Sequence, residues 1–151
     1  MNNEIIPLTH IRLQNDSTEW REAVISAGEL LVAGKCSLPA YTDEMLRVVE
    51  EFGPYIVVAP GIALAHARPS ASVLTAGLSL ITLSTPVAFG HEENDPVWLV
   101  IALCAPDKTS HLALLAQLVS FLDDENNLNF LKQCDDAEKI CLAINKTQKG
   151  E

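Results

Sequence analysis

Gly61-Ile62-Ala63-Leu64-Ala65-His66-Ala67-Arg68-Pro69 combines an apolar strand pattern with a histidine and an arginine at its end. An apolar run follows the opening glycine, and the proline at its end stops any regular structure. We therefore predict a buried strand that ends in a loop, with His66 at the rim of a sheet. Open α/β sheets bind their ligands beyond the carboxyl ends of such strands.

His66 and Arg68 are the first candidates for chemistry. An unprotonated imidazole is a nucleophile available near neutral pH. A guanidinium group offers a planar fork of donors that suits phosphate oxygens. The pair indicates phosphoryl chemistry, but a lone His-x-Arg is weak evidence. A strand-end histidine beside a solvated arginine is the alternative interpretation.

Composition limits the class of protein. The chain has 151 residues, of which 48% are hydrophobic and 20% charged, which predicts one domain covering residues 1–151. Its formal net charge of −10 argues against a nucleic-acid partner. Residues 97–105 form the longest apolar run, about half of the roughly 20 residues that a membrane-spanning helix needs. Residues 1–4 lack the basic start of a signal peptide, so we expect a cytoplasmic protein with reduced cysteines.

Helical periodicity recurs in several parts of the chain. Asp16-x-x-Glu19 has the form of a capping box and precedes a helix that ends at Gly34. A second helix is predicted from near Thr42 to Gly53. We expect the remaining helices and the frayed tail at these places: a helix capped by Thr109 or Ser110, two short helices around 128–133 and 137–145, and a tail over 146–151.

Strand patterns alternate with these helices. Apolar and β-branched runs predict strands at these places: 11–13, a buried strand over 55–59, 62–64, a central strand over 73–83, and a strand covered on both faces over 97–105. Helices precede, separate and follow the strands. This order predicts a single α/β domain with a mixed, mostly parallel sheet and helices on both faces.

Three other groups carry possible chemistry. His111 lies in the first turn of the predicted third helix, where free backbone N–H groups, Ser110 among them, favour an anion. His111 could therefore converge with His66 and Arg68 on a phosphoryl group, or could simply face solvent. His91 opens an acidic loop over 91–95, for which a solvated loop is a better interpretation than a metal site. Arg47 could lie by the site or on a polar helix face, and His10 is assigned to the surface or a strand, without a role.

The chain carries no nucleotide-binding loop of the G-x-x-x-x-G-K-[ST] or G-x-G-x-x-G kind. A phosphoryl group would therefore come from another phosphorylated molecule, such as a protein. No metal or other cofactor is expected.

Residues 53–69, from Gly53-Pro54-Tyr55 to His66-Ala67-Arg68-Pro69, resemble the phosphorylation-site segment of enzyme IIA proteins of the bacterial sugar phosphotransferase system, in the mannitol/fructose class. Residues 87–96 look closest to the L-ascorbate branch of that family. The likeness covers about residues 15–145. Ala65 stands where most relatives have proline, and Val48, not Arg47, falls where mannitol-type proteins carry an arginine near the site.

The resemblance implies a phosphocarrier without metal or nucleotide. His66 would accept a phosphoryl group from phosphorylated HPr and pass it to a cysteine of an enzyme IIB, which serves a membrane enzyme IIC. His111 would stabilise the phosphoryl group. Arg68, Ser110 and Arg47 are the candidates to bind it. Two alternatives stay open: a regulatory module that signals through phosphorylation-dependent protein binding, and a metal-dependent hydrolase using His66, His91 and His111. Homo-oligomerisation also stays open.

Overall fold

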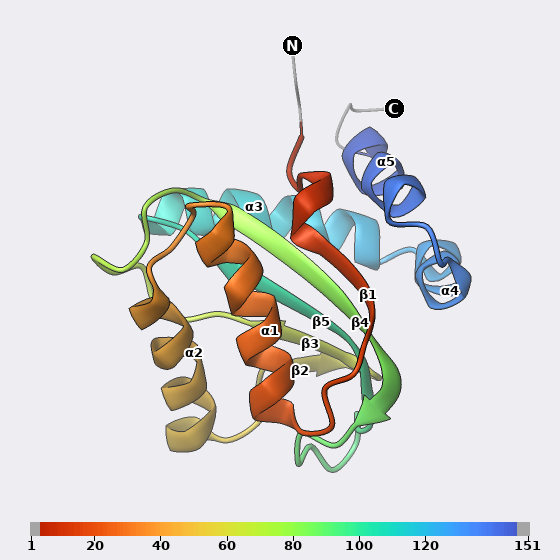
Figure 1. Cartoon of the computed structure of the whole chain (residues 1–151), viewed down its shortest axis with the longest axis horizontal. Coiled ribbons are helices and arrows are strands. Elements are labelled where there is room, and N and C mark those ends of the chain that lie inside the picture. Colours follow the sequence, from red (N-terminus) through yellow and green to blue (C-terminus); the bar gives the residue numbers. More distant parts are fainter. Residues whose placement is uncertain (1–3, 148–151) are drawn as a thin grey trace.

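A computed structural model of the chain describes residues 4–147. Its centre is a five-stranded sheet in the order β1-β4-β5-β3-β2 (Figure 1). The strands have these bounds: β1 (Ile11–Asn15), β2 (Val57–Ala59), β3 (Ile62–Ala65), β4 (Gly77–Val87) and β5 (Val97–Cys104). The pairs β1·β4 and β3·β5 are parallel, whereas β2·β3 and β4·β5 are antiparallel. The mixed sheet is confirmed, although parallel pairs do not outnumber antiparallel ones.

Helices cover both faces of this sheet, as predicted. They have these bounds: η1 (Leu8–His10), α1 (Trp20–Ala33), α2 (Pro39–Phe52), α3 (Lys108–Leu122), α4 (Glu125–Gln133) and α5 (Ala137–Thr147). α1 and α2 pack on one face, whereas α3 lies behind the sheet, with α4 and α5 beside it (Figure 1). Among residues 4–147, none of the helices is long and apolar enough to cross a membrane.

The residues of β3 alternate between the two cores. Ala63 and Ala65 face α1 and α2, and Ile62 and Leu64 face the α3 side. Continuing the alternation by one residue places His66 on the α3 side. The alternation of side chains along β3 therefore directs His66 toward α3.

Most helix starts differ from the sequence prediction. Glu19 caps α1 without a side-chain bond, and Glu22 accepts instead from the N–H of Thr18, so the capping box at Asp16 is wrong. α2 begins at Pro39, because proline suits the first helical position, and α4 begins at Glu125 behind an Asp124 cap. The C-terminal stop of α1 at Gly34 is confirmed.

The chain end also departs from expectation. α5 continues to Thr147, two residues beyond the predicted end at Asn145. The predicted frayed tail is therefore wrong for residues 146–147. From residue 148 on, that prediction lies outside the described residues, as do residues 1–3 of the segment that we compared with a signal peptide.

Two strand predictions need correction. β2 is an edge strand of three residues, and Tyr55 and Val58 are exposed, so residues 55–59 are not a buried strand. β4 begins four residues later than predicted and continues through Pro86 to Val87. The strand over 97–105 is confirmed as β5, which lies in the middle of the sheet and is almost entirely buried.

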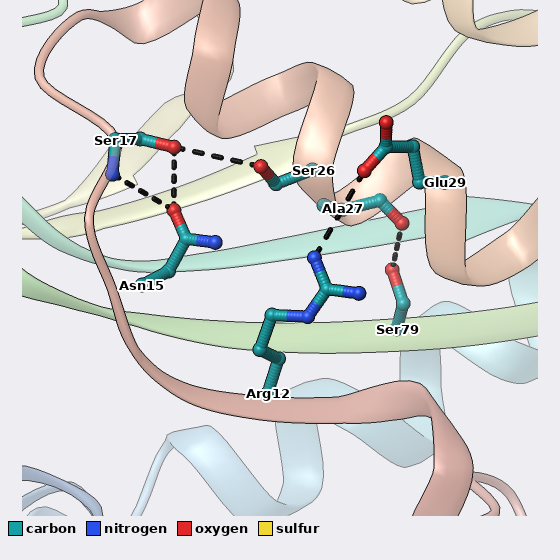
Figure 2. Close-up of polar contacts among 7 residues, drawn as sticks. All are labelled: Arg12, Asn15, Ser17, Ser26, Ala27, Glu29 and Ser79. Carbon is teal, nitrogen blue, oxygen red and sulfur yellow. Dashed lines mark hydrogen bonds and ion pairs between the residues drawn. The ribbon is translucent and has the colours of Figure 1, made fainter.

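Polar contacts fasten α1 to the sheet (Figure 2). The buried hydroxyl of Ser79 on β4 donates to the carbonyl of Ala27 at 2.7 Å, and Arg12 on β1 reaches Glu29 at 3.9 Å. His10 is buried, with Nδ1 at 2.8 Å from the carbonyl oxygen of Leu78. The prediction of a surface or strand position for His10 is wrong: it ends η1 and fastens that turn to β4.

Candidate functional site

His66 lies directly beyond the carboxyl end of β3, as predicted. Its Nδ1 is 2.9 Å from the carbonyl oxygen of Leu64. A carbonyl can only accept, so Nδ1 carries the hydrogen and donates it. In the neutral ring, Nε2 then holds the lone pair. The backbone of the strand end thus selects the tautomer in which Nε2 is the nucleophilic atom.

His111 meets His66 because β3 and β5 are parallel and adjacent. Their carboxyl ends lie at the same edge of the sheet, and α3 begins four residues after β5 ends. The two imidazole centroids are 5.8 Å apart, with an angle of 61° between the rings. The predicted convergence of these histidines is confirmed. The ring of Tyr55 lies on the edge of His66, also at 5.8 Å.

The start of α3 differs from the prediction. Asp107 is the N-cap, and its carboxylate accepts from the backbone N–H of Ser110 at 2.7 Å. Neither Thr109 nor Ser110 is the cap. The N–H of Ser110, which was predicted to hold phosphate, is thus already engaged, and Ser110 lies outside the lining of the His66 cavity. We leave Ser110 out of the proposed site.

Burial, and then the nearby His66, lower the pKa of His111 below its ordinary value. Near neutral pH the ring is therefore uncharged, with one N–H group. Its Nδ1 is buried without a hydrogen-bond partner in the described part of the chain. Buried polar atoms are rarely left unpaired, and a catalytic role is one explanation of an exception. A neutral His111 ring can donate a hydrogen bond to an oxygen of a bound group. Because it carries no charge, it does not repel a positively charged His66 ring.

A cavity of about 300 Å³ surrounds the two histidines. Arg68 and Lys108 contribute cationic side chains to its lining, and six further residues complete the wall: Val48, Phe52, Tyr55, Ala67, Pro69 and Leu112. Sequence reasoning missed Lys108. The signal was Asp107: with that residue as the N-cap, Lys108 takes the first helical position, at the end of α3 that favours anions. The cavity combines a nucleophile, a neutral donor and two cations.

Arg47 and Arg68 do not share this cavity. An adjoining hollow of about 390 Å³ contains both arginines together with Glu44 and Glu51. Of the two arginines, only Arg68 also lines the His66 cavity. Val48, the residue after Arg47, lines that cavity instead of Arg47. The structure therefore brings Arg68 to the histidines, whereas Arg47 lines only the adjoining hollow, which Glu44 and Glu51 also line.

His91 serves its own loop. Its Nδ1 accepts from the backbone N–H groups of Glu93 and Asn94 at 3.2 and 3.1 Å. The carboxylate of Asp95 accepts from three backbone N–H groups of the same loop, including that of His91. His91 does not line the cavity of the other two histidines. Within residues 4–147, no cluster of three His, Cys, Asp or Glu side chains is placed to hold a metal ion.

The chain is similar to known proteins over most of its length. The family model described as "Phosphoenolpyruvate-dependent sugar phosphotransferase system, EIIA 2" matches residues 4–147. A Salmonella typhimurium protein named ascorbate-specific PTS system EIIA component is 41% identical over 138 residues, which cover 91% of this chain and 90% of that protein.

Solved structures resemble the fold as a whole. The mannitol-specific cryptic enzyme IIA CmtB from Escherichia coli matches with a TM-score of 0.85 and 27% identity, covering 94% of this chain and 96% of CmtB. Enzyme IIA for mannitol from E. coli, solved in complex with phosphorylated enzyme IIB, matches with a TM-score of 0.79 and 27% identity, covering 97% and 98%. These likenesses extend over nearly the whole described chain.

Proposed function

Because this chain belongs to the EIIA type 2 family of the phosphoenolpyruvate-dependent sugar phosphotransferase system, we propose that His66 is its phosphoryl acceptor. His66 takes the group from the phosphohistidine of HPr and passes it to a cysteine of an enzyme IIB. The juxtaposition of the His66 and His111 rings in one open cavity carries this assignment.

The transfer needs no proton relay at His66. Nε2 attacks phosphorus as the donor's P–N bond breaks, and the ring becomes a phosphoimidazolium whose Nδ1–H still donates to the carbonyl of Leu64. In the second half-reaction, a thiolate sulfur of the partner attacks phosphorus, the Nε2–P bond breaks, and His66 returns to its neutral form. The Leu64 carbonyl thus stabilises the charge that appears on the ring.

The other cavity residues supply electrostatic stabilisation. His111 donates an N–H to a phosphoryl oxygen, and its lowered pKa keeps that ring neutral. Arg68 and Lys108 offset the negative charge that the phosphoryl group brings into the cavity. Positioning and charge stabilisation of this kind account for most catalysis of phosphoryl transfer.

We propose L-ascorbate as the sugar that this carrier serves, through its IIB and a membrane enzyme IIC, with the carrier itself in the cytoplasm. The support is the identity of 41% to a protein named for ascorbate over 91% of the chain. Onward transfer to an ascorbate IIB, measured against transfer to a mannitol IIB, tests this choice. Faster transfer to the mannitol IIB would contradict it.

Incubation with radiolabelled phospho-HPr tests the acceptor. Wild type should gain one acid-labile phosphoryl group, and His66→Ala should gain none, because no other nucleophile occupies that position. His111→Ala should remain folded but accept the group more slowly, by a factor on the order of 10². Unchanged kinetics in His111→Ala would refute its role.

His91→Asn is the matched control, because His91 lies outside the cavity. An asparagine oxygen can replace the ring nitrogen that accepts from the loop backbone. This variant should keep the wild-type rate. Labelling that persists in His66→Ala would overturn the acceptor assignment. Stable labelling without transfer to any IIB would favour the regulatory alternative.

A further inference from the structure

Tyr41 on α2 holds two separate backbone segments with one hydroxyl. The side chain is fully buried. Its oxygen accepts from the N–H of Ala67 at 2.9 Å. It lies 2.7 Å from the carbonyl of Leu103, to which it donates its single proton, with the carbonyl of Ala67 farther away at 3.2 Å. Burial raises the pKa of the Tyr41 phenol above its ordinary value, so the proton is retained.

The two segments are those that carry the histidines of the site. Ala67 directly follows His66. Leu103 is the penultimate residue of β5, which leads through a short loop into α3 and His111. Because backbone polar groups at this depth have no access to water, each needs its partner. The Tyr41 hydroxyl therefore links the His66 loop to the strand end from which α3 departs.

α2 also fastens the continuation of the His66 loop. Glu44, one turn after Tyr41, accepts from the hydroxyls of Ser70 and Ser72 at 2.8 and 2.7 Å. The N–H of Leu38 donates to the carbonyl of Ser72 at 2.8 Å. The start of α2 thus holds the chain after His66 in place through several hydrogen bonds. Of these contacts, Tyr41 makes the one nearest to His66.

We propose that Tyr41 is a positioning residue for phosphoryl transfer, whose hydroxyl holds His66 at its spacing from His111. The inference rests on the proposed function. Tyr41 lies outside the cavity lining and acts through Ala67 and Leu103. Positioning matters for this chemistry, since a displacement of about 1 Å can slow an enzyme on the order of 10²-fold.

The substitution Tyr41→Phe tests the proposal, because it keeps the ring and removes only the hydroxyl. We expect the rate of transfer from phospho-HPr at saturation to fall about tenfold or more, with an unchanged half-saturating donor concentration, since Tyr41 touches no partner surface. Ser79→Ala is the matched control. It removes an equally buried hydroxyl bond, to Ala27 of α1, and should leave the rate unchanged.

Two kinetic results would overturn the inference: a wild-type rate in Tyr41→Phe, or equal slowing in Ser79→Ala, which would indicate general loosening. Amide hydrogen exchange of the wild-type protein adds a test that needs no variant. The Ala67 amide should exchange slowly, and rapid exchange would overturn the proposal even where Tyr41→Phe fails to fold. If the wild type accepts no phosphoryl group, the proposed function fails instead, so the two failures are distinguishable.

Discussion

At the scale of single residues, the two histidines differ in what fixes their protons. A backbone carbonyl holds the Nδ1–H of His66 and leaves Nε2 free. His111 instead has an unpartnered Nδ1 and a pKa lowered by burial and by His66. In the proposed transfer, the first arrangement supplies the nucleophile and the second supplies a neutral donor. The surroundings of the two side chains, and not their chemistry, distinguish the proposed roles.

We expect His111 to contribute to the pH dependence of stability. Its pKa in the folded protein is below the ordinary value near 6.5. As pH falls through that ordinary value, the unfolded chain binds a proton before the folded protein does, so the free energy of unfolding decreases. The contribution of neutral His111 is fully present above that value. Urea unfolding from about pH 7.5 to 5.5 should show this loss.

His111→Gln isolates the contribution of this ring from that of the other histidines. Glutamine keeps a polar side chain in the first turn of α3 but does not titrate. Unfolding of this variant should depend less steeply on pH in the same range. An equally steep dependence in the variant would show that His111 is not the source.

At the scale of elements, periodicity predicted where helices lie better than where they begin. The apolar spacing of α1 and α2 identifies both, but Pro39 starts α2 three residues before the predicted Thr42. Asp107 similarly displaces the predicted cap of α3, and α4 begins at Glu125, before the predicted residue 128. A cap depends on which local side chain reaches a free N–H, and several neighbours compete for that role. Periodic burial involves many residues at once and is therefore the stronger signal.

The candidate site was predictable only in part. His66 at a strand end and His111 at a helix start follow from local pattern. Tyr41 reads as a core residue because it occupies an apolar position of a helix, and nothing local indicates that its hydroxyl reaches Ala67 and Leu103. Lys108 enters the cavity because β5 runs parallel to β3. Contacts of this kind depend on strand order, which the sequence pattern does not specify.

Gly61, between β2 and β3, should tolerate no side chain. It has φ of +79°, and an added Cβ would lie 2.6 Å from Nε1 of Trp98. We expect Gly61→Ala to lower the free energy of unfolding by roughly 2–4 kcal/mol, from backbone strain together with the steric clash. Thermal or urea unfolding measures this change.

Gly53 is the matched control for Gly61. It has a similar φ of +87°, but a Cβ there meets nothing within 4 Å. Its ψ of −177° places it in a region that essentially only glycine adopts, so Gly53→Ala should cost the backbone strain alone, about 1–3 kcal/mol. Equal destabilisation by the two substitutions would show that the Trp98 contact is relieved without cost.

At the scale of the whole molecule, two cores on opposite faces of one sheet place the site. The core under α1 and α2 includes Tyr41, and the core under α3 receives Leu64. The chain crosses between these layers at the carboxyl edge of β3 and β5. The site lies at this edge because only there can α2 hold the loop after His66 while α3 presents His111.

Charge is the other property of the whole molecule. The net charge is −10, whereas Arg68 and Lys108 give the site a local cationic character. Ion pairs do little to offset the excess of acidic groups. The pair of Arg21 and Glu50 is half exposed, and that of Arg12 and Glu29 spans 3.9 Å. Exposed pairs of this kind contribute about 0–1 kcal/mol each.

We therefore expect added salt to stabilise the protein. Repulsion among the excess carboxylates is greater in the compact state than in the unfolded chain, and raising ionic strength from about 0.01 to 0.15 M shortens the Debye length from about 30 to 8 Å. The free energy of unfolding at neutral pH should increase over this range of NaCl. Near the isoelectric point of about 4.7 the same salt should have little effect, because the net charge vanishes. A decrease with salt at neutral pH would mean that attractive charge pairs outweigh the repulsion.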